Sequence, residues 1–120
     1  MTTPADELTA AADKLRALAT NATPGPWRQH DTHLGQYGHT ATVLSGERNT
    51  TELRAWLPSM SHEPWDEARN VWADAAYIAV MHPGVGEALA KWLEAAAVDA
   101  VQIGPSPHAL TVARRINAAA

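Results

Sequence analysis

Residues 65–81 read WDEARNVWADAAYIAVM, and this stretch decides the fold. Apolar side chains recur in it at three- and four-residue spacing, which predicts a helix. Past Val71 the helix is apolar on nearly every side, a pattern typical of a helix that is buried between two layers. The sequence on either side of this stretch is therefore expected to supply those layers.

Two further helices are predicted after this stretch. His82-Pro83-Gly84 breaks its pattern, and proline suits the first position of a new helix. Gly104-Pro105 ends that helix, and Ser106 is expected to cap a last one that begins at Pro107. The residues expected to face inward from these two helices are Val85, Leu89, Trp92, Leu93, Ala96, Ala109, Val112, Ala113 and Ile116.

A helix and a small β-meander are predicted before it. Thr3 is expected to cap a helix whose first residue is Pro4, and Pro24-Gly25-Pro26 stops that helix. Extended segments follow at residues 27–33, 39–44 and 53–57. If the first two close as a symmetric hairpin, one face of the pair carries Trp27, Ala41 and Val43 and is expected to face the core, while Arg28, His30, Thr40 and Thr42 lie on the other face.

The third strand completes the predicted architecture. Leu53, Ala55 and Leu57 are expected to point inward, which leaves Trp56 on the opposite face. The order is an N-terminal helix, a three-stranded antiparallel β-meander and three helices packed on it, and this order predicts an α+β fold. A chain of this length is expected to form one domain over residues 1–120.

Composition limits the function classes. A net charge of −4 argues against a nucleic-acid coat and against a polybasic membrane binder. Without cysteine the chain has no thiolate zinc site and no thiol nucleophile. The sequence shows no signal peptide and no apolar stretch of membrane-spanning length, so a cytoplasmic location is expected.

The histidines offer one candidate metal site. His30 and His33 have a His-x-x-His spacing, but residues three apart on a strand face opposite sides. The predicted hairpin instead brings Asp31, His33 and His39 to one face, and two imidazoles with a carboxylate make an open site for a divalent transition metal. We favour the simpler interpretation that these are ordinary polar residues of a hairpin and that the chain uses no cofactor. The alternative is a small metal-binding module or a metal-dependent enzyme that uses the hairpin histidines.

No sequence signature of catalysis is present. Ser59-Met60-Ser61-His62-Glu63 brings a serine, a histidine and a carboxylate together, but adjacency in sequence is not the geometry of a catalytic triad. The chain has neither a nucleophile elbow nor a glycine-rich phosphate loop. The sequence therefore favours a non-enzymatic function.

Tryptophan supplies most of the aromatic bulk, because the chain has five tryptophans and no phenylalanine. Trp72 and Trp92 lie on helical apolar stripes and are expected in the core. Trp56 and Trp65 are either core residues or exposed anchors for a partner, since aromatic anchors dominate interface energies. The sequence thus predicts binding to another protein or self-association, with Trp56 and Trp65 as candidate contact residues.

Three segments carry a resemblance to known proteins. These are Ala22–Trp27, the run Trp72–Ala79 that leads to His82-Pro83, and the run Ala88–Leu93. Together they resemble small uncharacterised proteins of actinobacteria and their phages, and more loosely the early-region accessory proteins of lambdoid phages. The resemblance implies an accessory role in a phage or mobile-element setting, and it carries no catalytic residues to this chain.

Overall fold

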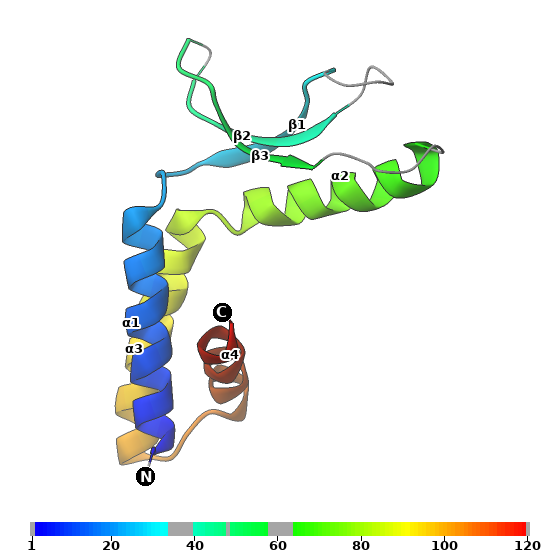
Figure 1. The fold of residues 1–120 in the computed structure, drawn as a ribbon. Helices are drawn as coiled ribbons and strands as arrows, with labels where there is room; N and C mark the ends of the chain where they lie inside the picture. Colours follow the sequence, from blue (N-terminus) through cyan, green and yellow to red (C-terminus); the bar gives the residue numbers. More distant parts are fainter. Residues whose placement is uncertain (1, 34–39, 48, 58–63, 120) are drawn as a thin grey trace. The chain divides into compact units, whose positions relative to one another are not determined.

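A computed structural model describes residues 2–33, 40–47, 49–57 and 64–119, the side chains of residues 64–70 excepted. No helix in these ranges is long and apolar enough to cross a membrane. The order of the elements confirms the predicted α+β fold (Figure 1). In chain order they are α1 (Pro4–Asn21), β1 (Trp27–Asp31), β2 (Ala41–Ser45), β3 (Glu52–Leu57), α2 (Pro64–Val80), α3 (Pro83–Gln102) and α4 (Pro107–Ala118).

The chain forms two compact units, each with its own cluster of buried residues. The helical unit comprises Met1–Thr23 and Pro83–Ala120 and contains α1, α3 and α4. The sheet unit comprises Pro24–His82 and contains the three strands and α2. The expectation that residues 1–120 act as one domain stays a prediction.

The predicted helix starts at Thr3 and Ser106 are confirmed. The Thr3 hydroxyl accepts a hydrogen bond from the Asp6 N–H at 3.1 Å, and the Asp6 carboxylate accepts one from the Thr3 N–H at 3.0 Å. These bonds from Thr3 hold the pKa of Asp6 below its usual value. The Ser106 hydroxyl accepts a hydrogen bond from the Ala109 N–H at 3.3 Å and so caps α4.

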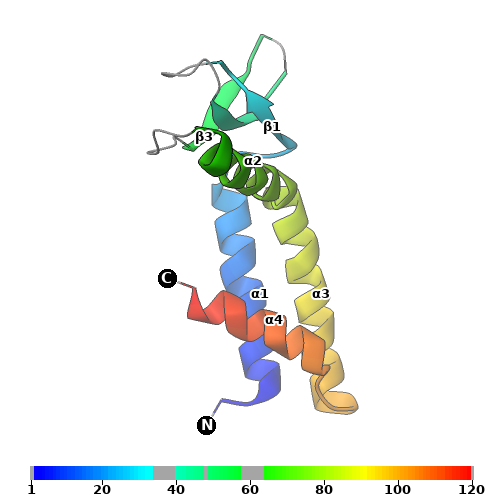
Figure 2. The ribbon, with the colours of Figure 1, turned by 90° about the vertical axis from the view of Figure 1, so that its right-hand side faces the viewer.

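Small residues build the core of the helical unit. Helices α1 and α3 run side by side in opposite directions, and α4 crosses them (Figure 2). Leu8 and Leu93 are the largest fully buried side chains between these helices. Alanines fill most of the remaining space and let the helix backbones approach closely. The alanines of the cluster around Leu8 and Leu93 are Ala11, Ala12, Ala96, Ala97, Ala109 and Ala113.

Polar contacts from α1 hold α4 in place. The Lys14 Nζ donates a hydrogen bond to the carbonyl oxygen of Ile116 at 2.9 Å and another to that of Ala119. The Ile116 carbonyl also accepts the N–H of Ala119 at 3.2 Å, so Lys14 adds a cation where the end of α4 directs its last carbonyl groups. Arg114 of α4 donates to the Glu7 carboxylate, with both nitrogen–oxygen distances at 3.3 Å.

Replacing Gly86 with alanine is expected to stabilise the helical unit. A Cβ at this position would lie 3.5 Å from the Ala19 Cβ and 3.6 Å from the Leu15 Cδ1, which is ordinary van der Waals contact. Alanine also favours a helix interior over glycine by about 1 kcal/mol. Chemical denaturation should therefore show a free energy of unfolding raised by about 0.5–1 kcal/mol. An unchanged or lowered value would show that the α1–α3 contact is tighter than described.

The sheet has the order β1-β2-β3 and is antiparallel throughout. Asp31 lies opposite Ala41 and Gln29 opposite Val43, as the symmetric hairpin predicts. Helix α2 lies along one face of the sheet (Figure 1). Ala41 and Val43 are buried against Ala75 and Ala79, and Trp27, Ala55, Leu57, Val71, Trp72 and Ile78 pack around them. The predicted core positions of Trp27 and Trp72 are thus confirmed.

Two expectations about burial are wrong. Helix α2 is not buried on nearly every side, because Tyr77 is 70% exposed and Val80 is exposed too. Within the sheet unit α2 meets the sheet along one side of the helix, and these residues lie on another side. Trp92 is 43% exposed, although its neighbour Leu93 is fully buried. Successive residues on a helix point about 100° apart. Because Leu93 points into the core, Trp92 lies at the edge of the buried side of α3.

Candidate functional site

The sheet face turned away from α2 is the strongest candidate surface, and we call it the open sheet face. Ala41 and Val43 of β2 point toward α2, so the residues that alternate with them point to the other side. Strand pairing assigns six residues to the open sheet face. They are Arg28, His30, Thr42, Leu44, Leu53 and Trp56.

Trp56 and Leu53 stand out from this face. Trp56 lies opposite the buried Thr42 and is 57% exposed, and Leu53 lies opposite Leu44 and is 54% exposed. A large aromatic side chain beside an aliphatic one offers apolar area that is buried when a partner binds. The sequence leaves both core and surface open for Trp56, and the structure places it on the surface.

The outward position of Leu53 corrects the prediction that it points inward. The register between β2 and β3 shifts at Val43 and Leu44, so that β3 carries one extra residue, Arg54, between two paired positions. An extra residue reverses the alternation of side chains on one side of the bulge. Ala55 and Leu57 therefore face the core as predicted, whereas Leu53 joins Trp56 on the open sheet face.

Arg28 is fixed on the open sheet face by two neutral oxygens. Its Nη1 donates to the Gly46 carbonyl at 2.6 Å, and its Nη2 donates to the Thr51 hydroxyl at 3.1 Å. These bonds tie β1 to the turn between β2 and β3. They hold the guanidinium in one place without a carboxylate, so the side chain keeps its positive charge available.

No ion pair to Arg28 is found within the described part of the chain. The Glu52 carboxylate is ion-paired with Arg54, and strand pairing places Glu52 opposite Ser45 rather than on the open sheet face. None of the six residues of the open sheet face is acidic. The face therefore combines an exposed tryptophan and leucine along β3 with an arginine and a histidine along β1.

The structure brings together two of the three predicted metal ligands. The Asp31 Oδ2 lies 3.6 Å from the His33 Nδ1, but the other carboxylate oxygen accepts the N–H groups of His33 at 2.9 Å and Thr40 at 3.0 Å. His33 has a φ of 56°, so the strand has already ended there. These bonds give Asp31 a role in closing the hairpin. No group of three or more histidine, aspartate or glutamate side chains suited to a metal is found among the described residues.

Several predicted positions lie outside the described residues. His39 is one of them, so the trio of Asp31, His33 and His39 stays a prediction. The same is true of residues 59–63, which held the serine, histidine and carboxylate run. Trp65 falls within α2, but its side chain is not among those described.

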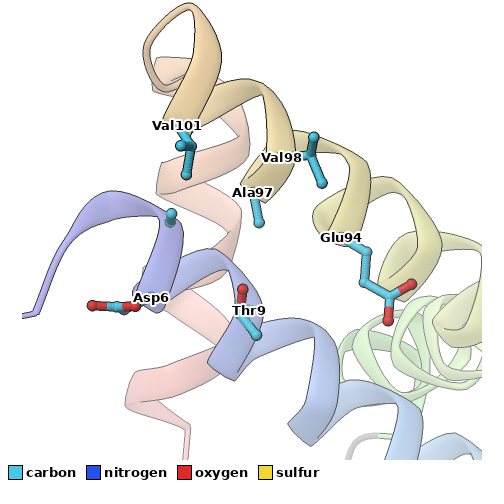
Figure 3. Close-up of a pocket in the computed structure, with 7 residues that line it drawn as sticks. Asp6, Thr9, Glu94, Ala97, Val98 and Val101 are labelled. Carbon is cyan, nitrogen blue, oxygen red and sulfur yellow. The ribbon is translucent and has the colours of Figure 1, made fainter.

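The helical unit carries a second candidate surface, an open groove between α1 and α3 (Figure 3). Its volume is about 350 Å³. Glu94 of α3 forms an ion pair with Arg16 of α1 at one end, and the hydrogen bond from Arg16 holds the pKa of Glu94 below its usual value. The lining residues are Ala5, Asp6, Thr9, Glu94, Ala97, Val98 and Val101. This surface was not predicted from the sequence, although Val98 and Val101 lie outside the predicted inward-facing residues of this helix and could have indicated it.

Comparisons with known proteins give no external assignment. No protein-family model, curated protein or solved structure matches the chain. The interpretation of the site therefore rests on its own chemistry.

Proposed function

We propose that this chain is a non-enzymatic accessory protein that works by binding another protein through the open sheet face. The observation that carries the proposal is the exposure of Trp56 beside Leu53 on a face rimmed by Arg28 and His30. Tryptophan and arginine are the residues that most often dominate binding energies at protein interfaces. A phage or mobile-element setting and a cytoplasmic location belong to the same proposal, and the resemblance of Ala22–Trp27, Trp72–Ala79 and Ala88–Leu93 supports the former.

The arrangement offers binding more readily than chemistry. The six side chains of the open sheet face include one histidine, His30. Strand pairing places His30 opposite the buried Thr42, and not opposite a carboxylate or a second acid–base group. General acid–base and nucleophilic catalysis need such groups within hydrogen-bond reach of one another. A sheet face with an apolar margin and a fixed cation instead matches the anatomy of a protein interface.

Site-specific photo-crosslinking in cells tests the proposal and captures the partner whatever its identity. A photo-crosslinking amino acid replaces Trp56 in one variant and Tyr77 in the other. Tyr77 is the matched control because it is an exposed aromatic residue of the same unit on α2. We expect a discrete crosslinked protein from position 56 and none from position 77.

The products separate the alternatives. A crosslinked species made of two copies of this chain identifies self-association through the open sheet face. A species that contains one different protein identifies a separate partner. Equal crosslinking from both positions, or none from position 56, contradicts the proposal.

A further inference from the structure

The distribution of charge and apolar area on the open sheet face indicates which partner fits it. We propose that this face binds an acidic segment of another protein that carries a bulky apolar side chain, an inference that rests on the function proposed above. Arg28 and His30 stand on β1, whereas Trp56 and Leu53 stand on β3. The two strands flank β2, so the margin that carries Arg28 and the apolar margin lie about 10 Å apart, two strand spacings. One short segment is long enough to reach both margins.

Arg28 supplies the attraction for an acidic group. Its guanidinium is held by the Gly46 carbonyl at 2.6 Å and the Thr51 hydroxyl at 3.1 Å, both of which are neutral. A cation that is already oriented loses little side-chain entropy when a carboxylate approaches it. Glu52, the acidic residue at the start of β3, is ion-paired with Arg54 and does not neutralise Arg28.

The same charges disfavour a second copy of this chain as the occupant. Two copies related by a twofold axis would present the same patch to each other. Each open sheet face would then set Arg28 and His30 against a face that has no carboxylate among its six residues. Arg28 would gain less from such a contact than from one with an acidic group, so the observations favour a different, acidic protein.

A nucleic acid fits this face less well. Single-stranded nucleic acids are usually held by several aromatic side chains in a positively charged groove. The open sheet face has one aromatic residue, and the chain as a whole has a net charge of −4. A peptide with a few acidic groups carries less negative charge than a nucleic-acid strand with one phosphate per nucleotide, so this negatively charged chain repels the peptide less.

Three synthetic probes test the inference against the full chain. The first is a short peptide with a central leucine and tyrosine flanked by glutamates, the second has lysines in place of the glutamates, and the third is a short oligothymidylate. Binding is followed through the indole N–H resonance of Trp56, which is assigned by its loss in Trp56→Tyr. We expect the glutamate peptide to bind at least about tenfold tighter than the lysine peptide, with a difference that shrinks as the salt concentration rises.

A matched pair of variants tests whether the acidic peptide binds to the open sheet face. His30→Glu adds a negative charge on the open sheet face, and Gln29→Glu adds the same charge at the next residue, which points to the other face. We expect His30→Glu to weaken the glutamate peptide about tenfold and Gln29→Glu to change its affinity less than about twofold. Equal effects of the two variants would overturn the assignment to this face.

The remaining outcomes are also decisive. Equal binding of the glutamate and lysine peptides overturns the acidic partner and leaves the protein-binding function standing. Tighter binding of the oligothymidylate than of the glutamate peptide overturns both. If no probe shifts the Trp56 resonance, the proposal of an acidic partner is overturned. The protein-binding function is then tested separately by crosslinking at position 56.

Discussion

Leu93→Ala is expected to lower the free energy of unfolding of the helical unit by about 3 kcal/mol. Leu93 is 0% exposed and packs in a cluster whose other buried members, apart from Leu8 and Leu110, are alanines. An alanine side chain has no atoms beyond Cβ with which to fill the space that a lost leucine leaves. The cavity therefore persists, and the cost comprises both the lost burial and the empty volume.

Far-UV circular dichroism during urea denaturation measures this loss. Leu18→Ala is the matched control, because Leu18 belongs to the same unit and is 59% exposed. We expect the control to change the free energy of unfolding by less than about 0.5 kcal/mol. Similar losses in the two variants would contradict the described core of α1, α3 and α4.

Gly46→Ala is expected to destabilise the sheet unit by about 3 kcal/mol. Gly46 has a φ of +83°, a conformation that costs alanine about 1–2 kcal/mol. A Cβ would also lie 2.2 Å from the carbonyl oxygen of Thr50, so the backbone of the turn would have to move. The Gly46 carbonyl accepts a hydrogen bond from Arg28, and movement there would disturb the contact that positions this cation.

Gly104→Ala separates the two causes. Gly104 also has a positive φ, +98°, but a Cβ there would meet no atom within 4 Å. We expect this variant to lose about 1–2 kcal/mol, the conformational part alone. Thermal or urea unfolding of both variants tests the difference, and equal losses would show that the turn at Gly46 has more room than described.

Much of the local structure was predictable because it depends on neighbouring residues. Thr3 before Pro4 and Ser106 before Pro107 mark the first residues of α1 and α4, since a hydroxyl and a proline each suit one position of a helix start. The hairpin register followed from a symmetric closure, and it set Asp31 opposite Ala41. Strand alternation then gave the correct sides for Trp27 and Trp56.

The errors concern features that depend on distant contacts. Nothing near Arg54 marks the bulge in β3, so alternation alone placed Leu53 inward. Trp92 and Leu93 both suit an apolar stripe, and the packing of α1 against α3 decides which of them is buried. The two units follow from this same pairing, because α1 and α3 are separated in the chain by the whole sheet unit. A pattern read along the sequence shows that a helix is amphipathic and does not show which helix covers it.

The claim that the open sheet face is a protein-binding surface centred on Trp56 is tested most directly by one affinity ratio. The measurement is the dissociation constant for the protein captured at position 56, compared between the unmodified chain and Trp56→Ser, with Tyr77→Ser as the control. We expect Trp56→Ser to weaken binding at least about thirtyfold, the effect of losing a central aromatic anchor, and Tyr77→Ser to leave it unchanged. A loss of less than about twofold for Trp56→Ser in a folded protein would contradict the account.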